Sequence, residues 1–335
     1  MTRKLLFGIN ILAIFLLMFS FLVPLIAPDK FPILSLLSLL TLPIIGVNAV
    51  FAVYWLMRWD RRFFLSALLL IGAHVYFGPF VLGRKNDKMV REEALKVLSH
   101  NVHLFDKYGG GYTHDKMSSE YERLISEQQP DILCLQEYTD AHDVDLSHYP
   151  HQYTYFNPPF KLMGQAIMSR YPILNRGSLD FENTANNVIY TDLLVGNDTL
   201  RVYNVHLQSL GINPTEKIAN HGAAEKLKTR ISTTFVKQQQ QLEQLLLHMK
   251  GTHHPKIIAG DFNNTAFSYV YREVAGRFQD TFQKEGHGLG ATYHFNRLPL
   301  RIDFIFSDSE LEVLNFETLE KSLSDHLPII AQFRR

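Results

Sequence analysis

The sequence predicts an α+β protein in which three membrane-spanning helices precede two packed β-sheets with helices outside them. Three observations lead to this prediction. Long uncharged apolar runs lie near the N-terminus, the charge changes abruptly after about residue 83, and short apolar segments with strand character follow beyond residue 94. The chain has 335 residues. The ~250 residues beyond the apolar runs are enough for a full hydrophobic core.

Charged residues are distributed unevenly along the chain. Residues 1–83 contain six Lys or Arg and two Asp or Glu, whereas the remainder contains 27 and 31, a formal charge of −4. The first quarter therefore has the composition of a segment embedded in a bilayer, and the remainder that of a soluble domain.

Three apolar runs, Leu5–Ala27, Pro32–Met57 and Phe63–Gly83, contain no charged residue. Each has the roughly 20 residues that a helix needs to cross ~30 Å of hydrocarbon. A cleaved signal peptide is the alternative for the first run, but its apolar stretch is longer than such a segment, and Leu25 interrupts a small-x-small cleavage pattern. We therefore expect a membrane domain over residues 1–90, with transmembrane helices at about 5–27, 32–57 and 63–83 and a charged connector, followed by a second domain over 91–335.

The number of positive residues on each side of the membrane does not determine the orientation of the chain. Five lie on the side of the N-terminus and of the turn between the second and third runs, and five lie on the other side. The two groups are Arg3, Lys4, Arg58, Arg61 and Arg62, and Lys30, Arg84, Lys85, Lys88 and Arg91. The first helix usually dominates, and large trailing domains translocate with little regard to charge. We therefore expect an integral protein of the plasma or inner membrane with its soluble domain outside the cytoplasm.

The soluble domain consists mainly of predicted strands. Helical spacing occurs over Asp115–Gln128 and Ile231–Met249, and Gly196-Asn197-Asp198 is a hairpin signature. Cys134 is the only cysteine, so no intrachain disulfide is possible, and its apolar surroundings indicate a buried small hydrophobe. The predicted strands are Leu95–Ser99, Asp131–Leu135, Val188–Leu194, Thr199–Leu207, Lys256–Ala259, Ile302–Phe306, Leu311–Phe316 and Leu327–Phe333.

Acids, amides and imidazoles stand at the ends of these strands. Sites are commonly built where elements of a rigid scaffold end. We therefore expect these side chains to converge on one rim of the packed sheets. They are Asn101, Gln136-Glu137, His206, Asp261, Asn263 and Ser324-Asp325-His326.

An ordered set of motifs extends from about residue 95 to the end of the chain and resembles the endonuclease/exonuclease/phosphatase superfamily. That superfamily includes pancreatic deoxyribonuclease, abasic-site endonucleases, neutral sphingomyelinases and inositol polyphosphate phosphatases. The resemblance implies a four-layer α/β/β/α sandwich with the site at one end, so that 91–335 is the catalytic domain. The motifs are Ser99-His100-Asn101-Val102, Leu135-Gln136-Glu137, Gly164–Arg170, Val205-His206-Leu207, Gly260-Asp261-Phe262-Asn263, Arg301–Ile305 and Ser324-Asp325-His326.

The resemblance implies a bound Mg²⁺, with Mn²⁺ as the alternative. Phosphoester hydrolysis needs a nucleophilic water, neutralisation of charge on phosphorus and a protonated leaving oxygen. Glu137 is the expected metal ligand because a hard cation prefers carboxylate oxygen, and Asn101 would complete or orient the ligand shell. Asp325 is expected either as a ligand to a second metal or as a residue that orients the neighbouring histidine.

Catalytic roles also follow from the resemblance. Asp303 would fix the tautomer of His326, which either deprotonates water or stabilises the pentacoordinate phosphorus. Asp261 would orient or deprotonate the water, and Asn263 would donate its amide to a non-bridging oxygen. His206 would contact the phosphate or serve as an acid. The family's further acidic residue before His206 is not identified, although Glu182 is a candidate.

Several other polar features receive a plainer interpretation. Gly109-Gly110-Gly111 lacks the Lys-Ser/Thr of a phosphate-binding loop, so we expect only a flexible segment. The histidines without metal-ligand spacing are expected to be surface or core residues. These are His100, His103, His114, His253 and His254.

The predicted function is metal-dependent hydrolysis of a phosphoester by an activated water at a membrane surface. A lipid-linked or small phosphoester is favoured over nucleic acid, because the chain beyond residue 83 is formally −4 and nucleic-acid binding relies on a basic surface. A membrane-anchored extracellular or periplasmic endonuclease is the alternative, with a basic cluster beside the predicted loop Gly211–Thr229 to bind a phosphate backbone. A non-catalytic scaffold is a lesser alternative, and no protein partner is implied. The basic cluster is Lys226, Lys228, Arg230 and Lys237.

Overall fold

The computed structural model describes residues 3–83, 94–106, 114–140, 144–158, 160–211, 221–321 and 323–334. Contacts divide the chain into two compact units. The first comprises Met1–Val81, Glu216–Gln239 and Asn264–Glu273, and the second comprises Leu82–Thr215, Gln240–Asn263 and Val274–Arg335. The predicted connector, the boundary near residue 90 and Gly109–Gly111 lie outside the described residues.

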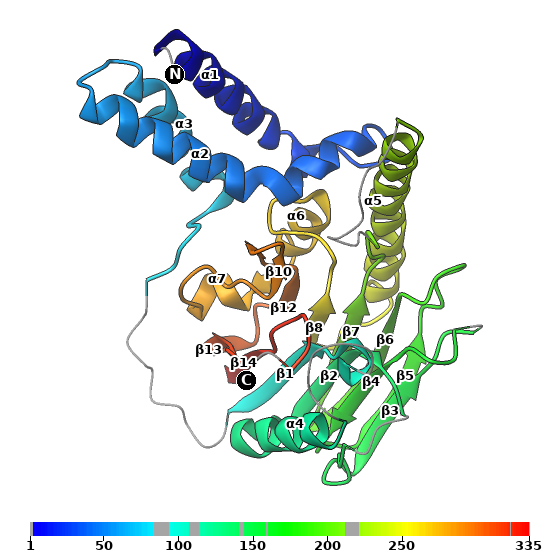
Figure 1. Cartoon of the computed structure of the whole chain (residues 1–335). Coiled ribbons are helices and arrows are strands. Elements are labelled where there is room, and N and C mark those ends of the chain that lie inside the picture. Colours follow the sequence, from blue (N-terminus) through cyan, green and yellow to red (C-terminus); the bar gives the residue numbers. More distant parts are fainter. Residues whose placement is uncertain are drawn as a thin grey trace. The chain divides into compact units, whose positions relative to one another are not determined.

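Two six-stranded sheets form the second unit (Figure 1). The first sheet has the order β13-β14-β1-β2-β4-β3, and the second has the order β5-β6-β7-β8-β12-β9. The first sheet contains β1 (Leu95–Asn101), β2 (Ile132–Tyr138), β3 (His151–Tyr155), β4 (Gly164–Ser169), β13 (Glu312–Thr318) and β14 (Ile329–Arg334). The second contains β5 (Ile173–Ser178), β6 (Asn187–Val195), β7 (Asp198–His206), β8 (Lys256–Asp261), β9 (Gln279–Asp280) and β12 (Asp303–Ser307). A separate hairpin consists of β10 (Tyr293–Phe295) and β11 (Leu298–Leu300).

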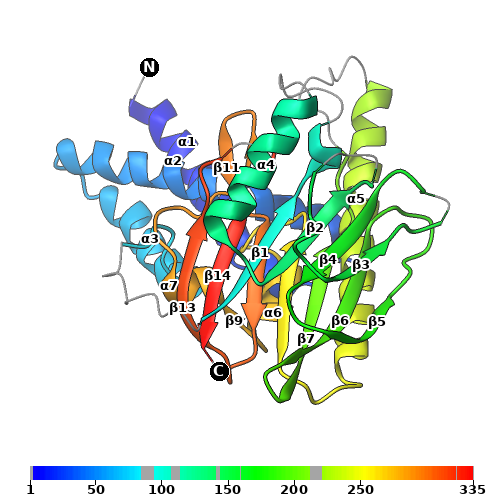
Figure 2. The same ribbon diagram turned by 90° about the horizontal axis from the view of Figure 1, so that it is seen from below.

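Successive side chains of a strand point to opposite faces of its sheet. One set of side chains therefore faces the other sheet, and the alternate set faces the helix outside. Val97, Cys134 and Ile257 belong to the core between the sheets. Leu98 and Leu133 face outward and pack in a second cluster with residues of α4 (His114–Gln128), which covers the outer face of the first sheet (Figure 2). The outer face of the second sheet contacts α5 (His221–Met249), whose His248 Nδ1 lies 3.0 Å from Tyr203 Oη. The predicted α/β/β/α sandwich is therefore confirmed. The remaining helical segments are α6 (Tyr269–Ala275), α7 (Thr281–Glu285) and the 3₁₀ turn η3 (His103–Asp106).

All eight predicted strands are present, and Gly196-Asn197 forms the expected hairpin turn between β6 and β7. The predicted start of the long helix at Ile231 is wrong, because α5 begins at His221. Ala, Lys and Leu dominate residues 223–228 and are strong helix formers, so the helix extends into the predicted Gly211–Thr229 loop. The basic cluster of residues 226–237 is therefore part of α5.

The first unit contains the N-terminal apolar helices α1 (Arg3–Ser20), α2 (Leu37–Met57) and α3 (Phe63–Phe77), with 3₁₀ turns η1 (Val23–Leu25) and η2 (Pro32–Leu36). Two described stretches, Arg3–Leu25 and Pro32–Met57, are long and apolar enough to cross a membrane. The prediction of a third span over 63–83 is wrong, because α3 has only 15 residues. It ends at Gly78, which has φ 82° and is followed by a proline that cannot continue a helix.

Polar side chains lie inside the group of N-terminal helices, and apolar side chains cover its surface. Asn10 donates to Ser66 Oγ at 2.8 Å and accepts from Trp55 Nε1 at 2.9 Å, which joins α1, α2 and α3. Asn10, Trp55 and Ser66 are completely buried, whereas Val50 and Leu68 are 69% and 73% exposed. This pattern is the reverse of that in a water-soluble helical bundle.

Candidate active site

Strand alternation carries polar side chains into one end of the space between the two sheets. On β2, the inward series runs from Ile132 and Cys134 to Gln136, and on β7 it runs through Asn204 to His206. Gln136 Nε2 donates to Asn204 Oδ1 at 2.7 Å, and Asn204 Nδ2 donates to the Leu135 carbonyl at 2.8 Å. These buried bonds join the two sheets where the apolar core gives way to the polar end.

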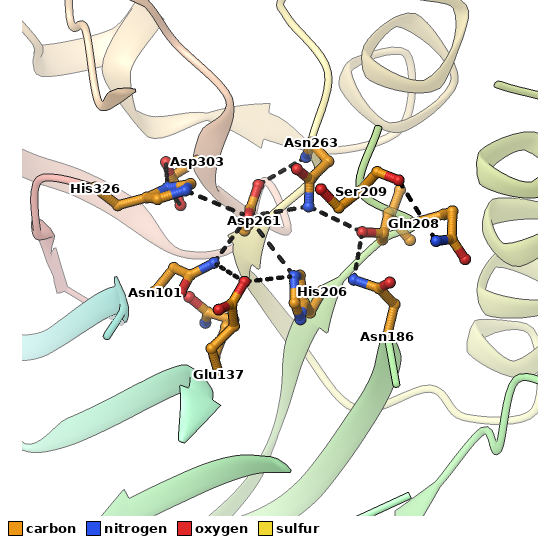
Figure 3. Close-up of polar contacts among 12 residues, drawn as sticks. Asn101, Glu137, Asn186, His206, Gln208, Ser209, Asp261, Asn263, Asp303 and His326 are labelled. Carbon is orange, nitrogen blue, oxygen red and sulfur yellow. Dashed lines mark hydrogen bonds and ion pairs between the residues drawn. The ribbon is translucent and has the colours of Figure 1, made fainter. Parts of the chain in front are cut away.

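Asp261 lies at the centre of the polar group and is 1% exposed (Figure 3). Its carboxylate accepts from the Asn263 backbone N–H at 2.7 Å, from Asn263 Nδ2 at 3.1 Å and from Asn101 Nδ2 at 3.1 Å. Asn263 has φ 50°, a left-handed conformation that turns its amide back toward the carboxylate. Gly260, the residue before Asp261, has φ 144°, and a Cβ there would lie 2.0 Å from the Val205 carbonyl oxygen. Only glycine therefore allows β8 to approach β7 so closely just before Asp261.

His326 and Asp303 form a buried imidazole–carboxylate pair. Asp303 is opposite Asp261 in the antiparallel register of β12 and β8. His326 Nδ1 lies 2.9 Å from Asp303 Oδ2, and its Nε2 lies 3.8 Å from Asp261 Oδ2. Ser324 Oγ accepts from the His326 backbone N–H at 3.0 Å and donates to the Asn101 carbonyl at 2.7 Å. The Ser-Asp-His motif thereby fixes the turn that carries the imidazole.

Burial and neighbouring charges strongly shift the pKa values of Asp261 and His326. Burial, followed by the neighbouring Asp303 carboxylate, raises the pKa of Asp261 to about 8, although His326 and the hydrogen bonds from Asn263 and Asn101 act to lower it. Burial disfavours a charged His326, but the Asp303 and Asp261 carboxylates outweigh it and raise the pKa of His326 to about 10. The positive charge of the protein therefore compensates only part of the negative charge that an ionised Asp261 would carry.

Glu137 and His206 complete the group from β2 and β7. Glu137 has φ 48°, uncommon for a residue with a side chain, and its Oε1 accepts from Asn101 Nδ2 at 3.2 Å. His206 Nε2 lies 3.7 Å from this Oε1 and 3.8 Å from Asp261 Oδ2, and it makes no hydrogen bond within the described part of the chain. Burial lowers the pKa of His206, so its imidazole is neutral at pH 7. A buried, neutral imidazole nitrogen without a partner is suited to receive a ligand atom.

The donor set fits a divalent cation. Asp261, Asp303 and His326 each offer a ligand atom, and these atoms lie within 4.8 Å of one another. The carboxylate of Glu137 and the amide oxygen of Asn101 belong to the same hydrogen-bonded group, and the sole cysteine, Cys134, is buried in the core. Carboxylate and amide oxygens favour hard cations such as Mg²⁺ and Mn²⁺.

Asp325, the third residue with a predicted metal role, is more exposed than the other members of that group, and its carboxylate contributes to the raised pKa of His326. Its side chain is 46% exposed, and its Oδ1 is 3.3 Å from His103 Nδ1. The His103 backbone N–H donates to Asn101 Oδ1 at 3.1 Å. His103, which the sequence analysis treated as a surface or core residue, therefore neighbours the site. Its position two residues after Asn101 was the available signal.

Two further residues at the site did not stand out in the sequence. Tyr293 forms an isolated antiparallel bridge with His326, and their ring centroids are 4.9 Å apart. Asn186 Nδ2 donates to the Leu207 carbonyl at 3.0 Å, the same oxygen that accepts from Asn263 Nδ2 at 3.0 Å (Figure 3). Glu182, the suggested further acid, is exposed and has no place in this hydrogen-bonded group among the described residues.

A two-sheet sandwich whose strand ends bring together carboxylates, amides and a paired imidazole is the arrangement of a family of phosphoester hydrolases whose fold generally binds a divalent metal. The chain belongs to the Endonuclease/Exonuclease/phosphatase family, whose model matches residues 98–326, more than half of its length. A second model, of a domain of unknown function, matches residues 3–80. A comparison with curated protein sequences found no match.

Solved structures share the fold at low sequence identity. An endonuclease/exonuclease/phosphatase family protein from Leptotrichia buccalis is 18% identical with a TM-score of 0.51, and the match covers 72% of this chain and 100% of that one. The human Nocturnin catalytic domain with bound sulfate anion is 18% identical with a TM-score of 0.53, covering 72% and 94%. D. rerio TDP2 complexed with single-strand DNA product is 16% identical with a TM-score of 0.53, covering 73% and 100%. These likenesses establish the fold of the second unit.

Proposed function

We propose that this protein is a membrane-anchored phosphoesterase that uses a divalent cation and an activated water to hydrolyse a lipid-linked or small phosphoester. The observation that carries the proposal is the arrangement around Asp261. Its buried carboxylate is bonded by Asn101 and Asn263 and faces Nε2 of the imidazole that Asp303 orients.

Each of these side chains has a role in the proposed reaction. With a cation bound nearby, whose positive charge would lower the pKa of Asp261 from about 8, the Asp261 carboxylate would be ionised at neutral pH, orient the attacking water and accept its proton. His326 is protonated at neutral pH, which favours stabilisation of negative charge on phosphorus over proton abstraction. Neutral His206 Nε2 would contact a phosphoryl oxygen, and Asn263 Nδ2 would donate to another in exchange for one of its two present acceptors, Asp261 Oδ2 and the Leu207 carbonyl.

Glu137 is the proposed principal ligand of the cation, with Asn101 and Asp325 as further metal residues. Mg²⁺ is favoured and Mn²⁺ is the alternative, because the donors are oxygen atoms without a thiolate. When bound, the cation supplies positive charge to the phosphoryl oxygens and so compensates the negative charge that the protein leaves on this group.

The N-terminal helices support attachment to a membrane. Two are long enough to cross a bilayer, and their polar side chains are turned inward while apolar side chains cover the outside. Arg3 pairs with Asp60, so the N-terminus and the turn after α2 lie at the same end of these helices. This arrangement agrees with a chain that places the Arg58–Arg62 turn and the N-terminus together on the cytoplasmic side.

Reporter fusions test this topology. The expected position of the catalytic domain outside the cytoplasm requires an odd number of spans, whereas two spans return the chain to the side of its N-terminus. A reporter that is active only outside the cytoplasm should therefore be silent both in the Arg58–Arg62 turn and after Arg335, because the first helix usually dominates a tied count of flanking charges. A reporter that is active only in the cytoplasm, placed at the same two positions, should be active in both and distinguishes this result from misfolding. Activity of the first reporter after Arg335 alone would show that the chain crosses the membrane a third time.

A lipid-linked substrate is favoured by the membrane attachment and by the formal charge of −4 beyond residue 83. The test uses full-length protein in vesicles, with a phosphoester lipid either in the same vesicles or in separate ones. Sharing a bilayer should raise the rate at least ~10-fold, because tethering raises the effective concentration of the substrate. A soluble phosphodiester should be hydrolysed equally in both arrangements. Equal rates on the lipid would contradict the preference.

An endonuclease is the second candidate, and one observation favours it. The cluster Lys226, Lys228, Arg230 and Lys237 lies along α5 and offers cations to a phosphate backbone. Robust cleavage of duplex DNA by the full-length protein at about 150 mM salt would reverse the ranking, because weak electrostatic binding does not survive such screening.

A further inference from the structure

The segment that follows the Asp261–Asn263 motif belongs to the same unit as the N-terminal helices. Residues Asn264–Glu273 group with Met1–Val81 and with the first half of α5. Asn263 turns its amide toward Asp261, while its neighbour Asn264 is 3% exposed and buried in the first unit. Asn263 therefore belongs to the candidate active site, whereas the next residue, Asn264, belongs to the unit of the N-terminal helices.

A buried polar cluster joins this segment to the start of α2. We call Ser38, Gln238, Asn264 and Thr265 the Ser38 cluster. Ser38 Oγ donates to Asn264 Oδ1 at 2.7 Å, and Thr265 Oγ1 donates to the Ser38 carbonyl at 2.7 Å. Asn264 Nδ2 donates to Gln238 Oε1 at 2.9 Å. All four side chains are at most 4% exposed, so loss of one partner would leave buried polar groups unsatisfied.

Apolar and main-chain contacts reinforce this attachment. The Phe267 ring centroid lies 5.1 Å from that of Phe77 at the end of α3, and Phe267 packs against the core of the N-terminal helices. Arg272 Nη1 donates to the Pro24 carbonyl at 3.3 Å. The stretch 264–272 is therefore held by the N-terminal helices at three separate points.

We infer that the N-terminal helices position the Asp261–Asn263 loop for catalysis, with Ser38, through Asn264, as the positioning residue. The left-handed backbone of Asn263 is a strained conformation that persists only where the surrounding structure holds it. The Ser38 cluster fixes the very next residue, so it restrains the peptide that sets the direction of the Asn263 amide. The inference rests on the proposed phosphoesterase function and makes the N-terminal helices more than a tether.

This positioning role has a consequence that a tether would not have. A tether raises the local concentration of lipid and leaves hydrolysis of a soluble substrate unchanged. A displaced Asn263 loop lowers the turnover of every substrate, because misplacement of a catalytic group by about 1 Å can cost ~10²-fold in rate. Turnover of a soluble phosphodiester therefore separates the two roles.

The experiment uses the full-length protein in detergent with Mg²⁺ and bis(p-nitrophenyl) phosphate. Ser38→Ala and Thr265→Val should each lower kcat about 10-fold, with KM changed by less than about 2-fold. Thr265→Ser keeps the donor hydroxyl and should retain kcat within about 2-fold of the wild type. Ser66→Ala is the matched control, because it removes a buried hydroxyl that bonds Asn10 within the same helices and has no contact in the Ser38 cluster. It should leave kcat unchanged even where it lowers Tm.

Hydrogen exchange gives a readout that does not depend on activity. Ser38→Ala should accelerate exchange of the amides in 261–265, and Ser66→Ala should not. Wild-type kcat in Ser38→Ala and Thr265→Val, or unchanged exchange in 261–265, would overturn the inference. A wild-type protein without hydrolysis of any phosphoester would instead refute the proposed function, and the exchange measurement would still decide whether Ser38 holds the loop.

Discussion

Replacement of Asp261 by asparagine is expected to lower turnover by at least ~10²-fold while leaving the fold intact. Asparagine has nearly the same shape, and its amide oxygen still accepts from the Asn263 backbone N–H. It cannot accept a proton from water, and it removes the ionisable carboxyl group that faces His326 Nε2 at 3.8 Å. The same loss is expected for His326→Ala, which removes the imidazolium that Asp303 orients. The measurement is kcat on a verified phosphoester, with circular dichroism to establish folding.

Glu182→Gln is the matched control for Asp261→Asn. It makes the same change of carboxylate to amide at an exposed acid, the candidate for the family's further acidic residue before His206. Its kcat should stay within about 2-fold of the wild type, because surface substitutions outside a hydrogen-bonded network have small effects. Near-native rates in both Asp261→Asn and His326→Ala would show that the proposed mechanism is wrong.

Strand pattern made much of the fold and the candidate site predictable. Three predicted strands run from apolar residues toward Asn101, His206 and Asp261, and strict alternation places these three side chains on the same inner face as the apolar residues before them. The convergence of these residues with Asp303 and His326 is what the structure shows. The strands β3, β4, β5, β9, β10 and β11 were not predicted. The edge strands β3 and β5 are short and consist largely of polar, partly exposed residues, and β9, β10 and β11 have only two or three residues each.

Other features depend on geometry that a linear pattern does not encode. The third apolar run continues without charge beyond Gly78, and this uniform composition obscured the Gly78-Pro79 stop signal at which its helix ends. His103 reaches Asp325 through a turn with positive φ, and Tyr293 reaches His326 through a short hairpin. Ser38 and Asn264 are separated by 226 residues, so their contact had no local signature.

Exhaustive chelation is expected to abolish hydrolysis, and addition of Mg²⁺ or Mn²⁺ should restore it. The reason is electrostatic. Asp261, Asp303 and Glu137 bring three carboxyl groups together in one buried or half-buried group, and burial beside the Asp303 carboxylate raises the pKa of Asp261. His326 supplies the only imidazolium among the described members of this group, since His206 is neutral. A phosphoester would add further negative charge, which the protein alone does not neutralise.

Glu137→Gln distinguishes a cation held by this group from one bound elsewhere. The substitution keeps the hydrogen-bonding oxygen near Asn101 and removes the charge, so the Mg²⁺ concentration for half-maximal activity should rise at least ~10-fold. Glu182→Gln, outside the group, should leave that concentration unchanged. The measurement is the initial rate across a Mg²⁺ titration of chelated, dialysed protein, with Mn²⁺ affinity measured by electron paramagnetic resonance. Full activity after chelation would remove the cation from the mechanism. Unchanged metal affinity in Glu137→Gln would move the ion away from Glu137, toward the Asp261, Asp303 and His326 atoms that lie within 4.8 Å of one another.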